Sequence, residues 1–82
     1  MIREHALTMR ALREGERLEL APLAEATGLS EADAVAAAFA LILAGLVAEV
    51  GSNPVAWAIT PTGRRWANTS IGRATLDMPA NL

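Results

Sequence analysis

The break between two helical segments at residues 28–30 constrains the fold of this chain more than any other feature. Ser30 is a good N-cap, and Asp33, three residues later, places a carboxylate in the first turn of the helix that follows. Gly28 can adopt the left-handed conformation that a tight turn requires. We therefore predict a helix from about Pro22 to Thr27, a short turn, and a longer helix from Glu31 to about Ala44.

The remaining elements follow from periodicity and from stop signals. A first helix is predicted from Ile2 to about Glu14, with Gly15 after it, and Leu18-Glu19-Leu20 fits a very short strand. Beyond Gly45, residues 46–50 and 55–59 alternate as two strands joined by a turn at 51–54. Thr60 caps a last helix that begins at Pro61 and runs to about Ala67. Weak periodicity in residues 68–82 predicts an arm or a partly disordered tail.

Three phrases in this order resemble those of the winged helix-turn-helix family, in particular bacterial regulators of multiple-antibiotic-resistance type and their relatives. They are Leu20-Ala21-Pro22-Leu23-Ala24-Glu25-Ala26-Thr27-Gly28-Leu29-Ser30, Leu43-Ala44-Gly45-Leu46-Val47 and Trp57-Ala58-Ile59-Thr60-Pro61-Thr62-Gly63-Arg64. The resemblance covers residues 2–67. It implies a mostly helical α+β domain at 1–67, with three helices, a two-stranded wing hairpin plus a short third strand, and a fourth helix. The tail, 68–82, lies outside it.

The resemblance also implies how such a chain would bind DNA. The third helix would enter the major groove, and the wing and the starts of the first two helices would contact phosphates. Base reading needs donors and acceptors such as those of Arg, Asn, Gln or Ser. With Val35, Ala38, Phe39 and Ile42 assigned to the core, the outward face of the third helix offers only Asp33. The wing turn, residues 51–54, has no Arg or Lys.

That outward face is apolar instead, and exposed apolar stripes tend to mark contact surfaces. One interpretation is that a partner protein or a second copy docks there, since small side chains let another backbone come close. The alternative is that alanine only supports helicity and the tail half covers Leu41. The candidate docking residues are Ala32, Ala36, Ala37, Ala40, Leu41 and Ala44.

The chain has seven arginines, no lysine and a formal charge of −2, which does not favour a polyanion partner. Arg3 and Arg10 share one face of the first helix, and Arg13 and Arg17 follow. One interpretation is a solvated face shared with neighbouring glutamates. The other is a patch for non-specific contacts with the DNA backbone, so that Arg3, Arg10, Arg13 and Arg17 are candidate phosphate ligands.

No set of residues predicts catalysis or a cofactor. His5 is the only histidine, cysteine is absent, and no glycine-rich phosphate loop is present. We therefore expect no enzyme activity, no metal and no small-molecule ligand. The longest apolar stretch, Ala34–Leu43, is too short for a membrane span, and the N-terminus has no apolar signal region. These features predict a cytoplasmic protein without a membrane partner.

Two functions remain open at this stage. The first is a small regulatory module that acts through protein contacts of the third helix, by self-association or by docking on a partner. An antirepressor or an inhibitor of a nucleic-acid-binding machine would be of this kind. The second is a DNA-binding transcription regulator of winged-helix type, acting as a dimer.

Overall fold

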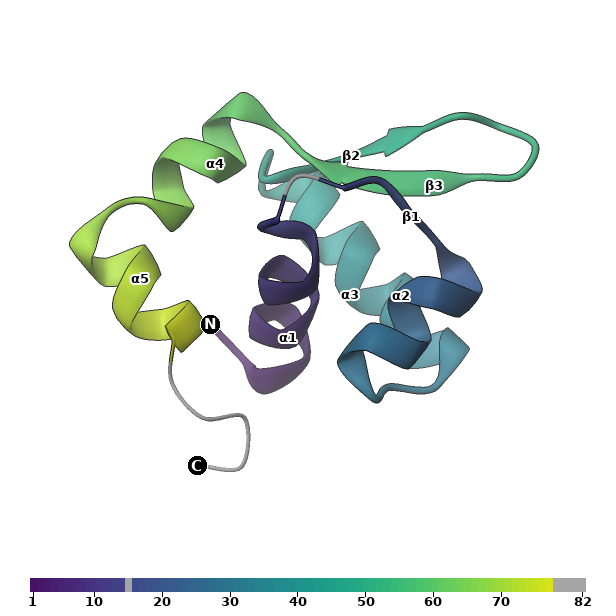
Figure 1. Ribbon diagram of the computed structural model, residues 1–82, viewed down its shortest axis with the longest axis horizontal. Helices are drawn as coiled ribbons and strands as arrows, with labels where there is room; N and C mark the ends of the chain where they lie inside the picture. The colour runs from purple at the N-terminus through teal and green to yellow at the C-terminus, as the bar shows by residue number, and fades with distance from the viewer. Residues whose placement is uncertain (15, 78–82) are drawn as a thin grey trace.

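The computed structural model describes residues 1–14 and 16–77 and has the architecture of a winged helix-turn-helix (Figure 1). The predicted mostly helical α+β class is confirmed. In chain order the elements are α1 (Arg3–Leu12), β1 (Leu18–Glu19), α2 (Leu20–Thr27), α3 (Glu31–Leu43), β2 (Val47–Val50), β3 (Ala56–Ile59), α4 (Pro61–Ala67) and α5 (Ser70–Asp77).

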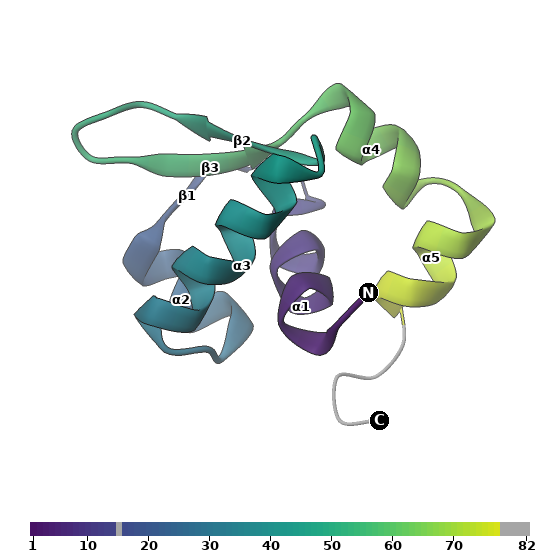
Figure 2. The same ribbon diagram turned by 180° about the vertical axis from the view of Figure 1, so that it is seen from behind.

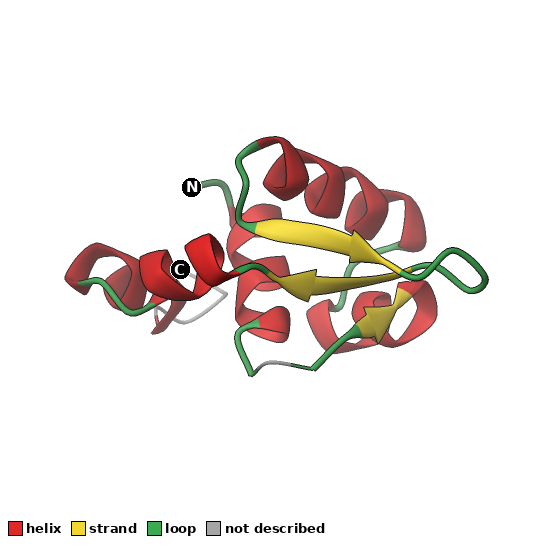
Figure 3. Cartoon of the chain, turned by 90° about the horizontal axis from the view of Figure 1, so that it is seen from above, coloured by secondary structure: helices red, strands yellow, loops and turns green. Residues whose placement is uncertain are grey.

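The three strands form one antiparallel sheet in the order β1-β3-β2. Val47 pairs with Ile59 and Val50 with Ala56 in the wing hairpin, while Leu18 pairs with Trp57 on the other side of β3. Figure 3, seen from above, shows the sheet lying across the helices. The short third strand therefore ties the segment between α1 and α2 to the wing.

The core lies between α1, α2, α3 and the sheet. Its largest buried side chains are leucines and a methionine from the helices, closed on the sheet side by Trp57. Burial of each large apolar side chain contributes about 1.5–3 kcal/mol to folding. The helical members are Met9, Leu12, Leu23, Leu41 and, from α5, Leu76.

The turn between α2 and α3 matches its sequence signals. Gly28 has φ of 74°, in the left-handed region, and the Asp33 amide donates a hydrogen bond to Ser30 Oγ at 3.1 Å. One detail differs, because α2 begins at Leu20 and Pro22 is its third residue rather than its first. The first turn still tolerates proline there, since its N–H groups have no partner within the helix.

The end of α3 is joined to the start of α4. The Leu46 amide donates to the Leu41 carbonyl at 3.0 Å, and Gly45 has φ of 78°, as in a Schellman-type helix end. The predicted Thr60 cap is confirmed, because Thr60 Oγ1 accepts from the Gly63 amide at 2.9 Å. The same hydroxyl donates to the Gly45 carbonyl at 2.7 Å, so one side chain serves both helix ends.

Residues 70–77 differ from the sequence prediction of an arm, because they form α5, which packs on α1 and α4. Leu76 is buried in the core, and Gly72 lies so close to the Trp66 carbonyl that a Cβ would clash with it. Arg13 Nη1 lies 2.8 Å from Asp77 Oδ1 and links the end of α1 to the end of α5. The rest of the predicted tail, 78–82, and the predicted stop at Gly15 lie outside the described residues.

Within the described part of the chain, no single helix is long and apolar enough to cross a membrane. Helices α2 and α3 reach the required length and composition only as a pair, and that pair is bent by 97°.

Candidate functional site

Helix α3, which is seen from its outer side in Figure 2, is apolar around most of its circumference. Its buried residues are Ala34, Ala37, Ala38 and Leu41. This corrects the predicted inward stripe, since Val35 and Phe39 point to solvent and Ile42 is half-buried. Both stripes have helical spacing, so periodicity alone does not choose between them. Small alanines against α1 and α2 allow a close approach of backbones that Phe39 would prevent.

Two of the predicted docking residues are consequently wrong. Ala37 and Leu41 are each 2% exposed and belong to the core, where Leu41 contacts the side chains of the central cluster. Ala32, Ala36 and Ala44 are exposed as predicted, and Ala40 is half-buried. The outward face also contains three larger side chains that the sequence pattern had not placed there.

Those three side chains form one stripe along α3. Val35, Phe39 and Leu43 are spaced by four residues, which puts them on one side of a helix. Their exposed fractions are 41%, 59% and 74%, respectively. We call Val35, Phe39 and Leu43, together with Ala32 and Ala36, the α3 face. An exposed face with a phenylalanine at its centre is a stronger contact surface than one made of alanine alone.

The chemistry of the α3 face does not suit a DNA groove. None of its five side chains carries a hydrogen-bond donor or acceptor for a base edge. The exposed residues beside it at the start of the helix are Glu31 and Asp33, which would repel phosphates. Ser30 is engaged as the cap of the same helix. Apolar contacts with thymine methyl groups are the only base contacts that this face can make.

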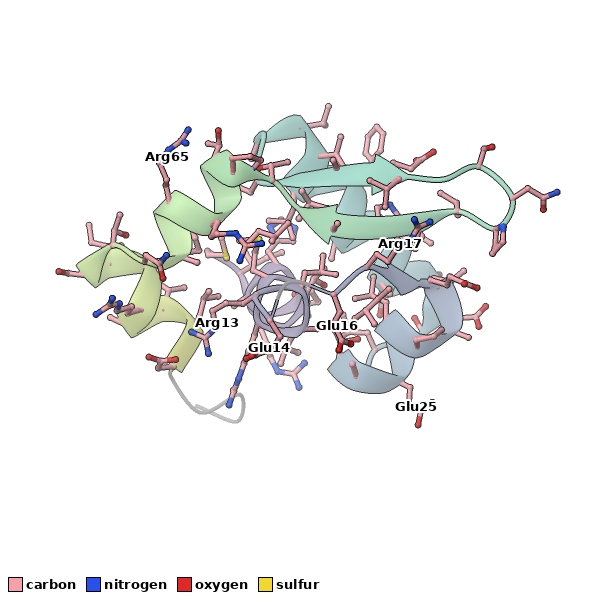
Figure 4. The ribbon with its side chains drawn as sticks, turned by 45° about the horizontal axis from the view of Figure 1, so that its top comes forward. Arg13, Glu14, Glu16, Arg17, Glu25 and Arg65 are labelled. Atoms are coloured by element: carbon pink, nitrogen blue, oxygen red, sulfur yellow. The ribbon has the colours of Figure 1, made fainter. Side chains whose placement is uncertain are left out.

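The charges of the chain are divided by segment. Residues 18–63 contain five carboxylates and no Arg, Lys or His, whereas the remaining residues contain all seven arginines and four carboxylates. The formal charge is therefore −5 for the segment of β1 to the start of α4, and +3 for the rest. Figure 4 shows Glu25 of α2 and Arg65 of α4 at opposite ends of the molecule. The five carboxylates, all exposed, belong to Glu19, Glu25, Glu31, Asp33 and Glu49.

The four candidate phosphate ligands do not form one patch on the α3 side. Arg3 and Arg10 are exposed on α1, and Arg13 is held by Asp77 at the α5 end of the fold. Arg17 is different, because its guanidinium lies against the wing. A Cβ added to Gly51 would stand 2.7 Å from Arg17 Nη2. The wing turn has no cation of its own, yet the fold places one beside it (Figure 4).

Groups that could act in catalysis or bind a metal are few in residues 1–14 and 16–77. In that part of the chain no group of three His, Cys, Asp or Glu side chains comes together to hold a metal ion. His5 is half-buried on α1. Glu14 and Glu16 follow the end of α1, and Figure 4 shows them apart, with Glu14 on the side of Arg13 and Glu16 on the side of α2.

Comparison with known proteins gives a likeness of structure rather than of sequence. No family model matches the chain, and no curated protein sequence matches it. Among solved structures, it is similar to a MarR-family transcriptional regulator from Silicibacter pomeroyi DSS-3, with a TM-score of 0.77 and 18% identity. It is also similar to a MarR-family protein from Bacillus stearothermophilus, with a TM-score of 0.73 and 18% identity.

The likeness extends over nearly the whole chain but only part of its counterparts. It covers 90% and 94% of this chain, and 54% and 52% of the Silicibacter and Bacillus proteins, respectively. The chain thus spans about half the length of these structures. The predicted resemblance to regulators of this type is confirmed at the level of the fold, which is the winged helix-turn-helix of MarR-family transcriptional regulators.

Proposed function

We propose that this protein is a small regulator of the winged-helix transcription type whose α3 face binds protein rather than base pairs. The observation that carries the proposal is the exposure of Val35, Phe39 and Leu43 on the helix that would enter a DNA groove. The fold supports the regulatory class, because it matches that of MarR-family transcriptional regulators. The side chains support protein contact, because aromatic and aliphatic anchors are typical of the buried centre of protein interfaces.

A second candidate function is DNA binding as a dimeric transcription regulator. The fold comparisons favour this candidate over protein contact. The position of Arg17 against Gly51 adds support, because it gives the wing a cation for a phosphate. Against it stand the five carboxylates of residues 18–63 and the lack of base-reading groups on the α3 face.

Titration with fluorescent duplex DNA of mixed sequence separates the two candidates. If the α3 face binds protein, no saturable binding to DNA is expected at about 50 mM or at about 200 mM salt. Saturable binding that weakens steeply between these salt concentrations, and weakens further in Arg17→Ala, would contradict the proposal and establish the second candidate.

The protein-contact proposal also predicts a selective loss of binding. A protein that binds the wild type should fail to bind Phe39→Ser, yet should still bind Ile2→Ser. Ile2 is a matched control, since it is 58% exposed against 59% for Phe39 and lies at the start of α1. Equal retention by both variants would show that the α3 face is not the contact surface.

A further inference from the structure

The corner made by α4 and α5 has the opposite character to the α3 side. Residues 61–76 contain Arg64, Arg65 and Arg73 and no carboxylate, and all three arginines are exposed. Arg65 Nη2 donates to Thr62 Oγ1 at 3.2 Å, on the outer side of α4, where Figure 4 shows it pointing away from the body of the protein. Ile71, at the start of α5, is 73% exposed. Helices α4 and α5 thus expose three cations and one large apolar side chain.

The α3 face and this corner are complementary. One is a row of apolar side chains next to Glu31 and Asp33, and the other carries three exposed arginines and an exposed isoleucine on α4 and α5. Exposed apolar area favours burial in both places, and the charges favour bringing the two together. In Figure 2, α3 faces the viewer while α4 and α5 stand at one side of the molecule. One copy therefore does not bring its own two surfaces into contact.

We infer that the α3 face docks on the α4–α5 corner of a second copy of this chain, in a head-to-tail contact. The inference rests on the proposed function, because it names the partner of the same protein-binding face. In the contact, Phe39 and Leu43 pack against Ile71 of the neighbouring copy, and Glu31 and Asp33 lie near its arginines. In a pair joined this way, one copy keeps its α4–α5 corner free and the other keeps its α3 face free.

A symmetric contact between two α3 faces fits the charges less well. Two α3 helices packed antiparallel would place Glu31 and Asp33 of each copy beside the C-terminal end of the other helix. That end carries a partial negative charge from its carbonyl groups, and no basic residue occurs in the last turn of α3. Head-to-tail packing avoids this repulsion. It also adds copies in sequence, so it yields a ring if the rotation closes and a filament if it does not.

Two variants, each damaged on one surface, test the inference. In Phe39→Asp the α3 face is disrupted and the corner is intact, while in Ile71→Asp the reverse holds. Both side chains are exposed, so both variants should fold, which circular dichroism checks. Sedimentation of the wild type should show a mass that rises with concentration and falls with added salt. Each variant alone should remain a monomer, and an equimolar mixture should reach twice the monomer mass and no more.

The mixture decides between geometries. A symmetric α3 contact would leave Ile71→Asp dimeric, which would overturn the head-to-tail contact. A monomeric wild type at all concentrations, or a mixture that stays monomeric, would also overturn it. A second pair, Leu43→Asp and Arg65→Glu, repeats the test with different side chains. The failure of this inference can be distinguished from the failure of the proposed function. If the wild type is monomeric and does not bind DNA, only the head-to-tail contact is wrong, and the α3 face can still bind another protein. If the wild type binds DNA, the proposed function is wrong.

Discussion

The hydroxyl of Thr60 donates a hydrogen bond to the carbonyl of Gly45 at 2.7 Å and accepts one from the Gly63 amide at 2.9 Å. It thereby closes the wing at its base, because Gly45 precedes β2 and Thr60 follows β3. Replacing Thr60 with Val keeps the shape of the side chain and removes both hydrogen bonds. We expect a loss of about 1–2 kcal/mol in the free energy of unfolding, measured by denaturant titration.

Thr62→Val is the control for that experiment. Thr62 is exposed, and its hydroxyl accepts a hydrogen bond from the exposed Arg65 side chain. Its replacement should change stability by less than about 0.5 kcal/mol. Equal losses in the two variants would mean that the Thr60 hydroxyl does not hold the wing.

Glycine is required at position 63 because there is no space for a side chain, and not because the backbone adopts a left-handed conformation. A Cβ at this position would clash with the Leu46 carbonyl, at the point where α4 passes the start of β2. Gly63→Ala should therefore destabilise the fold by about 1–3 kcal/mol, although alanine is the better helix former. Thermal unfolding checks this. Ser70→Ala, at an exposed position in α5, is the control, and a Gly63→Ala variant as stable as wild type would contradict the clash.

Substitutions on the two sides of α3 should lower the free energy of unfolding by very different amounts. Leu41→Ala removes a fully packed core side chain and should cost about 2–5 kcal/mol. Leu43→Ala removes the same atoms from a side chain that is 74% exposed, and its cost should stay below about 0.5 kcal/mol. The pair is matched in residue type and lies two positions apart on one helix. A greater loss of stability in Leu43→Ala than in Leu41→Ala would mean that Leu41 lies on the outward face, as the sequence pattern predicted.

Helix α5 is part of the folded unit. Leu76→Ala should destabilise the protein by about 2–5 kcal/mol, because Leu76 fills the core between α5 and α1. Asp77→Asn removes the ion pair with Arg13, whose side chains are 28% and 60% exposed, and should cost only about 0.2–1 kcal/mol. Hydrogen exchange provides the check. If the amides of residues 70–77 exchanged through local opening while those of the other helices required global unfolding, α5 would be peripheral.

The elements that the sequence predicts well are those specified by local chemistry. The Ser30 cap, the Gly28 turn and the capping bond of Thr60 each join residues only a few positions apart, so they can be predicted without knowing the rest of the fold. The strands of the wing follow for the same reason. The winged-helix order was therefore predictable from beginning to end of residues 2–67.

What the sequence does not specify is decided by contacts between distant segments. The inward side of α3 depends on the small volume of Ala34, Ala37 and Ala38 against α1 and α2, since polarity is nearly uniform around the helix. Helix α5 is short and is held by Leu76 and Gly72, while its other large apolar side chain, Ile71, is exposed. The wing cation, Arg17, comes from a residue more than thirty positions before the turn it contacts.

The division of α3 into two apolar stripes has a consequence for how this protein can change over evolutionary time. The stripe of alanines and Leu41 is closed to larger side chains, because the neighbouring helices fill the space. Val35, Phe39 and Leu43 are exposed, so core packing restricts their identity far less. New binding specificities can therefore arise at three positions, by single substitutions among good helix formers, with little change in the stability of the scaffold.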